Sequence, residues 1–155
     1  MYIVQLDGPG SDVETVRELF REYAGSLGFS LDFQGFEHEI AQLPGEYAPP
    51  GGRLLVAVDK GQAVGCVALR RLDAETCEMK RLYVKSRFRG AGVARALAYG
   101  LVAEARRMGY RRMRLDTLPV MGEARLLYQS MGFREISPYY QNPLPGAVYM
   151  ELRLG

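Results

Sequence analysis

Residues 76–95, TCEMKRLYVKSRFRGAGVAR, decide the fold that we expect. The first part, Thr76–Val84, predicts a strand, and the glycines that follow it lead into the apolar spacing of a long helix. Gly90 and Gly92 allow the backbone to approach a ligand, and unpaired amides at a helix start attract an anion. Three arginines add positive charge around these glycines: Arg87, Arg89 and Arg95. The segment predicts an anion-binding cradle, with a tight turn and a solvated basic face as the alternative.

Two phosphate-binding motifs do not fit the spacing of these glycines. A dinucleotide-binding G-x-G-x-x-G fingerprint requires a glycine where Arg95 stands. A P-loop requires a lysine directly after its second glycine, and none is present there. The sequence therefore argues against both of these nucleotide-binding classes.

The remaining pattern resembles a known family at two separate places. The pattern R-x-x-G-x-G at residues 87–92, directly after a strand, resembles the pyrophosphate loop of the GNAT superfamily of acyl-CoA-dependent N-acyltransferases. The pattern A-x-x-L-Y-x-x-x-G-F at residues 124–133 resembles the helix-to-strand signature of the same family. The resemblance implies an α/β fold of the mixed α+β type: a central, twisted, mostly antiparallel sheet flanked by about four helices, with a splayed strand pair that binds the cofactor.

Hydrophobic periodicity predicts the other elements of one GNAT-type domain, residues 1–155. This length suits a single domain, and a composition that is 48% hydrophobic suffices to fill its core. Strands are expected at residues 2–6, 53–58, 63–71, 76–84, 112–118, 133–136 and 147–154, and helices at residues 11–28, 34–43, 93–109 and 122–131. Ser11 and Glu14 form a capping box at the first helix start. The Pro- and Gly-rich loop at residues 44–52 is either a plain connection or part of a substrate wall.

Charge is segregated along the chain, although the net charge is only +2. Residues 80–114 carry eleven bases and one acid, a net charge of +10, whereas the two flanks together carry −8. This basic middle agrees with the resemblance, because CoA carries a diphosphate and a ribose phosphate. Nucleic-acid binding is a weaker alternative, since no aromatic stacking platform is interleaved with the bases, and we expect no nucleic-acid partner.

Cysteine, histidine and hydropathy patterns argue against several other classes. Cys66 and Cys77 are not spaced as a C-x-x-C pair, and with His38 as the only histidine they do not supply the four ligands of a structural zinc site. We expect no metal and interpret both cysteines as reduced packing residues. No apolar run approaches the ~20 residues of a membrane span, and the N-terminus carries no basic-then-apolar signal. We therefore expect a cytoplasmic protein without a membrane partner.

The resemblance implies acetyl-CoA as the co-substrate. The backbone of Leu82, Tyr83 and Val84 is expected to pair with the pantetheine arm, and the Leu82 N–H to polarise the thioester carbonyl. Residues of the glycine-rich loop are expected to hold the pyrophosphate: Arg87, Arg89, Gly90, Ala91, Gly92, Val93, Ala94 and Arg95. Tyr128 lies where the family often places a phenol beside the CoA sulfur, and this phenol would protonate the leaving thiolate.

One position departs from the family pattern. The family often has an asparagine three residues before the alanine of the second motif, and this chain has Met121 there. The amide contact to the cofactor is thus lost or replaced, and Thr117 is a candidate for the replacement.

A general base is required, because aminolysis of a thioester needs a neutral amine. Glu78 lies on the central strand at a position where some family members carry a glutamate base, and it is our first candidate. Asp116, on the following strand, matches an acidic position of other members and is the second. Ordered water is the third option. The alternative interpretation of each carboxylate is a strand residue paired with a basic side chain. His38 is interpreted as a solvated helix residue rather than a catalyst.

Aromatic residues next to the irregular segments are candidates for the acceptor pocket, with plain packing as the alternative: Phe33, Phe36, Tyr47, Tyr139 and Tyr140. Acidic residues gather in the same part of the chain: Asp32, Glu37, Glu39 and Glu46. They favour a cationic small amine or a peptide N-terminus over an acidic acceptor.

The leading prediction is therefore an enzyme that moves an acetyl group from acetyl-CoA to a primary amine of a small molecule or peptide, by direct attack through a tetrahedral intermediate. Neither cysteine has a histidine nearby in sequence, which disfavours an acyl-enzyme. The alternative is a non-catalytic sensor or partner module that binds acyl-CoA. Similar proteins commonly form a homodimer through their C-terminal strands. A homodimer is therefore one possible assembly that we expect for this chain.

Overall fold

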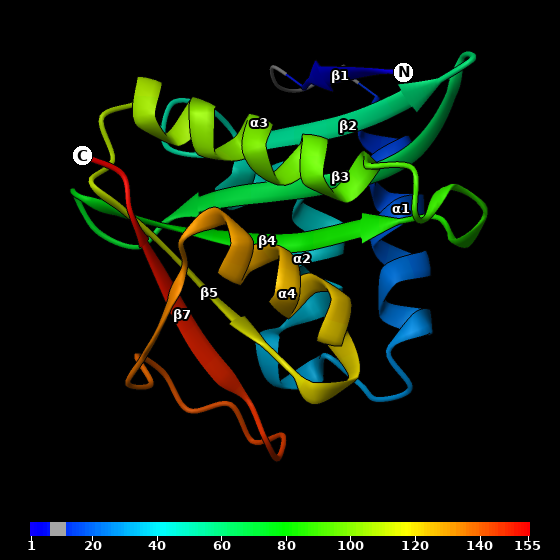
Figure 1. Ribbon diagram of the computed structural model, residues 1–155. Coiled ribbons are helices and arrows are strands. Elements are labelled where there is room, and N and C mark those ends of the chain that lie inside the picture. The colour runs from blue at the N-terminus through cyan, green and yellow to red at the C-terminus, as the bar shows by residue number, and fades with distance from the viewer. Residues whose placement is uncertain (7–11) are drawn as a thin grey trace.

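The computed structural model describes residues 1–6 and 12–155 (Figure 1). Its strands are β1 (Tyr2–Gln5), β2 (Arg53–Asp59), β3 (Gln62–Arg71), β4 (Thr76–Val84), β5 (Arg112–Thr117), β6 (Arg134–Ile136) and β7 (Val148–Arg153). Its helices are α1 (Val13–Ser26), α2 (Phe36–Gln42), α3 (Val93–Arg107) and α4 (Gly122–Met131), with short 3-10 turns η1 (Asp32–Gln34), η2 (Gly45–Tyr47), η3 (Ser86–Phe88) and η4 (Pro119–Met121). Every expected strand and helix is confirmed, with ends that shift by at most two residues. The capping box predicted at Ser11 lies outside the described residues.

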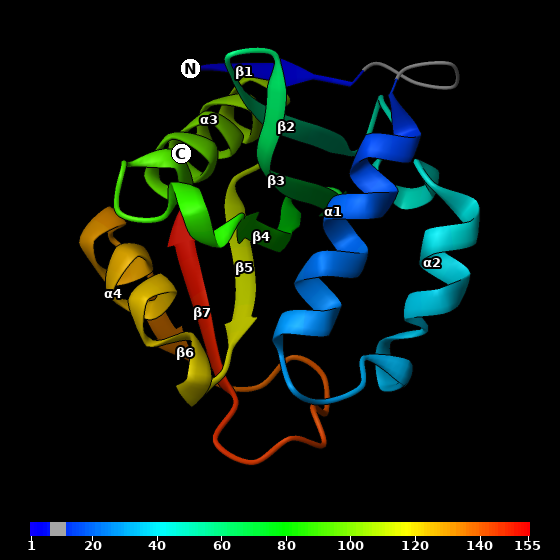
Figure 2. The same cartoon turned by 90° about the vertical axis from the view of Figure 1, so that its right-hand side faces the viewer.

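The strands form one seven-stranded sheet in the order β1-β2-β3-β4-β5-β7-β6. All neighbouring strands are antiparallel except β4 and β5, which run parallel. Helices α1 and α2 cover one face of the sheet, and α3 and α4 cover the other (Figures 1 and 2). This arrangement confirms the expected mixed, mostly antiparallel sheet between helices.

Each face of the sheet buries its own apolar layer. Leu97 and Leu101 of α3 are fully buried on one face, while Val16 and Phe20 of α1 are fully buried on the other. Burial of each such side chain contributes about 1.5–3 kcal/mol to folding, so these stripes hold the helices on the sheet. Within residues 1–6 and 12–155, no helix combines the length and the apolar character that a membrane crossing requires.

The parallel strands β4 and β5 separate soon after they meet. Their pairing runs only from Thr76 opposite Arg112 to Glu78 opposite Arg114, and both strands then continue apart. Beyond this point the backbone groups of β4 that face β5 have no partner in that strand. The splayed strand pair that the resemblance implied is thus present, and it opens a gap in the middle of the sheet.

A β-bulge in β4 lies beside this gap. Its register with β3 shifts between Cys66 and Ala68, so that Arg81 and Leu82 together face Val67. Arg81 adopts a left-handed conformation with a φ of +62°, which is uncommon for a residue other than glycine. The bulge interrupts the alternation of side chains: Arg81 contacts α2, whereas Leu82 packs into the layer under α3.

Candidate active site

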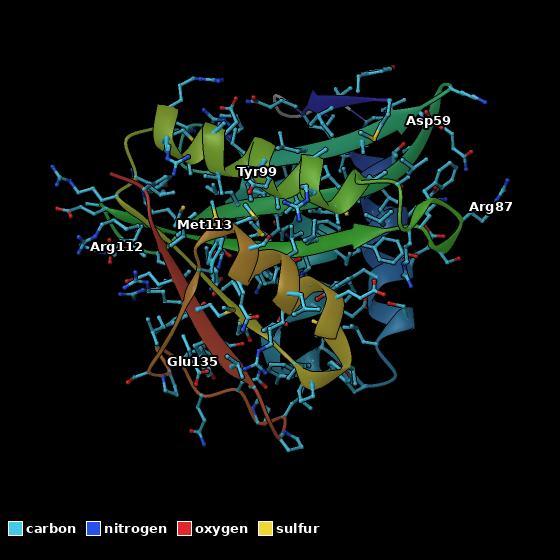
Figure 3. All side chains as sticks on the ribbon, in the orientation of Figure 1. Asp59, Arg87, Tyr99, Arg112, Met113 and Glu135 are labelled. Carbon is cyan, nitrogen blue, oxygen red and sulfur yellow. The ribbon has the colours of Figure 1, made fainter. Side chains whose placement is uncertain are left out.

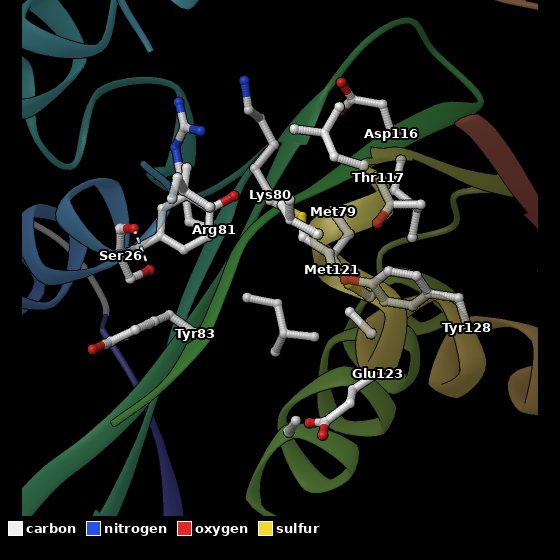
Figure 4. Close-up of a pocket in the computed structure, with 18 of the residues that line it drawn as sticks. Ser26, Met79, Lys80, Arg81, Tyr83, Asp116, Thr117, Met121, Glu123 and Tyr128 are labelled. Atoms are coloured by element: carbon white, nitrogen blue, oxygen red, sulfur yellow. Dashed lines mark hydrogen bonds between the residues drawn. The ribbon is translucent and has the colours of Figure 1, made fainter. Parts of the chain in front are cut away.

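A pocket of about 1030 Å³ opens where β4 and β5 diverge (Figure 4). On one face of the sheet it is bounded by Tyr23 of α1, by Leu31 just before η1 and by Phe33 within η1. On the other face it is bounded by Ala94 of α3 and Tyr128 of α4. The pocket therefore passes through the gap between the strands, and two ligands can meet there from opposite faces of the sheet.

One end of the pocket, the glycine-loop end, is formed by the segment that the sequence singled out. The lining residues between positions 82 and 95 of this segment are Leu82, Tyr83, Val84, Arg89, Gly90, Ala94 and Arg95. Gly90 and Gly92 both have a φ of +82°, a conformation that side chains disfavour. Gly92 precedes α3, and no side chain caps this helix start, so its first-turn amides are free to bind an anion.

Four residues predicted to bind the cofactor do not line this pocket: Arg87, Ala91, Gly92 and Val93. The side chain of Arg87 projects into solvent from the tip of the loop (Figure 3). Val93 is 4% exposed and packs in the layer under α3. Ala91 and Gly92 are exposed next to the pocket wall, so only their backbone groups can serve a ligand.

Arg89 and Arg95 leave positive charge at the glycine-loop end. The Nε of Arg89 donates to the carbonyl oxygen of Val84 over 3.0 Å, and its guanidinium lies 5.9 Å from the Tyr83 ring centre. The Arg95 guanidinium lies 5.8 Å from the Tyr99 ring centre. Neither arginine forms an ion pair with any described carboxylate. A phosphate group entering this end meets two cations that are available for pairing.

Tyr128 lies on α4 at the wall of the pocket. Its side chain is 7% exposed, and its ring packs on Phe133 with 5.6 Å between ring centres. Burial raises the pKa of the Tyr128 phenol well above its usual value. The phenol therefore stays protonated at neutral pH and is able to donate a proton to a group in the pocket.

The two candidate carboxylates occupy different environments. Glu78 is 1% exposed and does not line the pocket. One of its oxygens accepts a hydrogen bond from Arg70 Nε at 2.7 Å, and the other accepts one from the Tyr139 hydroxyl at 2.6 Å. Asp116 lines the pocket and accepts hydrogen bonds from the Tyr140 hydroxyl and, at 2.9 Å, from Asn142 Nδ2. Of the two, only Asp116 is placed to meet a ligand.

The five aromatic candidates for the acceptor pocket separate into three groups. Phe33 lines the pocket, whereas Phe36 and Tyr47 are 5% and 2% exposed and pack in the layer beneath α1 and α2. Tyr139 and Tyr140 line a separate hollow and contribute hydroxyl groups to Glu78 and Asp116. Burial raises the pKa of both phenols, so they act as hydrogen-bond donors. Phe36 and Tyr47 are core residues in this fold, because α2 turns the ring of Phe36 inward and η2 does the same for Tyr47.

The acidic wall that we expected around the acceptor is not part of the pocket. Among the lining residues are none of the four acids proposed for it: Asp32, Glu37, Glu39 and Glu46. Three of them form ion pairs, Glu37 with Arg21, Glu39 with Arg81 and Glu46 with Arg70. The expectation failed because position in the sequence does not reveal which charges cancel after folding.

The structure adds to the site two cations that the sequence analysis counted in the basic segment but did not assign to binding, Lys80 and Arg81 (Figure 4). Arg81 is 4% exposed, and its guanidinium donates to both carboxylate oxygens of Glu39 at 2.9 and 2.8 Å and to Gln34 Oε1 at 2.8 Å. The β-bulge turns this arginine toward α2, and the sequence contains no local sign of a bulge. We refer to the part of the pocket lined by Lys80, Arg81 and Asp116 as the Asp116 end.

Met121, which departs from the family pattern, and Thr117, the candidate replacement for its missing amide contact, both line the pocket. Thr117 is 2% exposed, and its Oγ1 has no hydrogen-bond partner among the described residues. A buried hydroxyl without a partner costs about 1–3 kcal/mol, which a ligand group in the pocket would recover.

The two cysteines and the histidine do not line the pocket. Cys66 and Cys77 are buried free thiols, as predicted, and neither lines the pocket. Burial raises the pKa of Cys77 to about 12 and raises that of Cys66 further, so neither forms a nucleophilic thiolate at neutral pH. His38 is an exposed residue of α2, which confirms the interpretation of it as a helix residue.

Comparisons with known proteins identify the family of this chain. A sequence model described as "Acetyltransferase (GNAT) family" matches residues 13–133. An uncharacterized N-acetyltransferase of Schizosaccharomyces pombe is 40% identical over 145 residues, which are 92% of this chain and 89% of that protein. The N-acetylaspartate synthetase of Danio rerio is 38% identical over 110 residues, which are 70% of this chain and 39% of that protein. The family that the two motifs suggested is confirmed.

A solved structure shares the fold. The aminoglycoside 6'-N-acetyltransferase complexed with coenzyme A superposes with a TM-score of 0.75 at 15% identity, covering 99% of this chain and 97% of that one. A fold that holds coenzyme A in that protein is consistent with the use of an acyl-CoA by this family.

Proposed function

The chain belongs to the acetyltransferase (GNAT) family, and we propose that it transfers an acetyl group from acetyl-CoA to a primary amine of a small molecule or peptide. One observation carries this proposal: a single pocket joins a cationic, glycine-lined end to an end with a carboxylate, through a gap in the sheet. The names of two relatives, which specify N-acetylaspartate and an aminoglycoside, both support a small molecule with an amino group as the acceptor.

Acetyl-CoA fits the glycine-loop end, and it supplies the thioester carbonyl that the amine attacks. The first-turn amides of α3 and the side chains of Arg89 and Arg95 bind its pyrophosphate in this proposal. The free edge of β4 at Leu82–Val84 pairs with the pantetheine arm as an added strand would. The partnerless Thr117 Oγ1 is placed to replace the amide that Met121 lacks, since it needs a hydrogen-bond partner inside the pocket.

The reacting groups come from three elements around the gap. The Leu82 N–H, at the bulge of β4, stabilises the oxygen that gains negative charge as the amine nitrogen attacks. Asp116 takes the proton that the nitrogen loses as the carbon–nitrogen bond forms. Tyr128 gives its proton to the sulfur as the carbon–sulfur bond breaks. Solvent then takes the proton from Asp116 and returns one to the phenol, so that both groups are restored.

Asp116 takes the role that the sequence first assigned to Glu78. Both oxygens of Glu78 are engaged by Arg70 and Tyr139, and the carboxylate is shielded from the pocket. A proton acceptor has to reach its substrate directly or through one water molecule, and Asp116 meets this geometric condition. We therefore assign Glu78 a structural role.

Steady-state kinetics test the proposal. Release of the CoA thiol is followed with a panel of primary amines while acetyl-CoA and the amine are varied together. Direct attack predicts initial-rate lines that intersect. Parallel lines together with an isolable acetyl-cysteine would contradict direct attack, and calorimetric binding of acetyl-CoA without thiol release for any amine would indicate a sensor instead.

A further inference from the structure

The side chain of Lys80 is the one cation at the Asp116 end that has no partner among the described residues. It lines the pocket on β4 and takes part in no ion pair or hydrogen bond of residues 1–6 and 12–155. The neighbouring cations are already matched, Arg70 with Glu78 and Arg81 with Glu39. Burial, reinforced by the nearby Arg81, lowers the pKa of the Lys80 ammonium, so its charge is costly when the pocket is empty.

Asp116 is the matching unpaired anion of the same region. It accepts hydrogen bonds from Tyr140 and Asn142, which are neutral, and it forms no ion pair with any described base. Lys80 and Asp116 thus line one pocket from two diverging strands without pairing with each other (Figure 4). A ligand that bridges them needs a nitrogen for the carboxylate and an anionic group for the ammonium.

We propose that the acceptor is an amino acid with a free carboxylate, and that Lys80 binds this carboxylate while Asp116 faces the amino group. This inference rests on the proposed acetyl transfer and narrows its substrate class. Pairing with the substrate compensates the buried charge of Lys80, since an ion pair in a partly dry pocket is stronger than one in water. A polyamine or an aminoglycoside, which has no carboxylate, places a further cation beside Lys80 and Arg81 and is disfavoured.

The test compares acceptors that differ only in the carboxylate. The twenty standard L-amino acids and their carboxamides are assayed by thiol release, together with spermidine and kanamycin. We expect at least one amino acid to be a substrate whose kcat/KM exceeds that of its amide by about tenfold or more, because a charged hydrogen bond contributes ~1.5–3 kcal/mol.

Two variants locate the effect at Lys80. We expect Lys80→Met to raise the KM of the preferred amino acid by about 10- to 100-fold, to remove its advantage over the amide, and to leave the KM of acetyl-CoA unchanged. Lys80→Arg keeps the charge and should retain part of the preference. The control Lys60→Met removes the same charge from an exposed turn between β2 and β3 and should change neither constant. Thermal unfolding verifies that each variant is folded.

The possible outcomes distinguish failure of the carboxylate inference from failure of the proposed acetyl transfer. Equal use of amino acids and their amides, or a preference for spermidine or kanamycin, overturns the carboxylate inference and leaves acetyl transfer intact. A Lys80→Met variant that keeps the preference overturns the role of Lys80. Absence of thiol release with every acceptor overturns acetyl transfer itself and the inference with it.

Discussion

The two ends of the pocket are built in different ways. The glycine-loop end comes mainly from one continuous segment, residues 82–95, and offers backbone amides with two arginines. The Asp116 end gathers side chains from β4, β5, η1 and the loop before β7, and its carboxylate is held by Tyr140 and Asn142. A short motif can bind the part of a ligand that is the same throughout a family, because backbone amides do not depend on side-chain identity. The part of a ligand that differs between family members is selected by side chains that only the fold brings together.

The basic segment shows a similar contrast between its own two ends. At the start of α3, Arg89 and Arg95 have no carboxylate partner among the described residues. At the far end, Arg107 pairs with Glu104, Arg111 and Arg112 pair with Glu75, and Arg114 pairs with Glu151. The positive charge of residues 80–114 therefore remains available at the pocket, whereas ion pairs neutralise most of it beyond α3. Figure 3 shows Arg87 and Arg112 at these opposite ends.

The largest effect is expected from Tyr128→Phe, at the junction of the two pocket ends. Loss of the proton donor should lower kcat by about 10²- to 10⁴-fold, while the Kd of acetyl-CoA changes little. Thiol-release kinetics and calorimetry measure the two quantities. Tyr99→Phe, at an exposed tyrosine of α3, is the matched control. An unchanged kcat would remove Tyr128 from the mechanism.

The two carboxylates provide the next comparison. Asp116→Asn should lower kcat by about 10²-fold without a large loss of stability, because the group faces the pocket. Glu78→Gln should instead lower the free energy of unfolding by about 1–3 kcal/mol, because it breaks a buried, charged hydrogen bond with Arg70. Kinetics and urea unfolding of both variants distinguish the roles. The reverse result, with catalysis lost only in Glu78→Gln, would restore Glu78 as the base.

The smallest effect is expected at the glycine-loop end. Arg89→Ala and Arg95→Ala should each raise the KM of acetyl-CoA by about 3- to 10-fold and leave kcat unchanged, since both side chains are exposed and screened by water. The increase should shrink as salt is added. Arg111→Ala removes a charge of the same sign beyond α3 and should not change this KM. Equal effects of all three variants would show that overall charge, not position, attracts the co-substrate.

The helices and strands, and the glycine-loop end of the pocket, were predictable from the sequence because they depend on local interactions. The apolar spacing of residues 93–107 and the positive φ of Gly90 and Gly92 are properties of short segments. Two motifs therefore sufficed to indicate the family, the order of elements and the residues around the glycine loop. The placement of Phe36 and Tyr47 was not predictable in this way, since a ring beside a loop either lines a pocket or fills the core.

The Asp116 end was decided by the tertiary structure alone. Arg81 pairs with Glu39 across 42 positions of sequence, and the Tyr140 hydroxyl donates a hydrogen bond to Asp116 across 24. The bulge at Arg81 turns that side chain toward α2, and the separation of β4 from β5 leaves Lys80 and Asp116 in one pocket without an ion-pair partner among the described residues. The sequence by itself indicated where we propose that a phosphate-bearing ligand binds, because backbone amides at a helix start are a local feature. Only the fold decided which charged side chains form ion pairs and which remain available to the proposed acceptor, because ion pairing depends on contacts between residues that are distant in sequence.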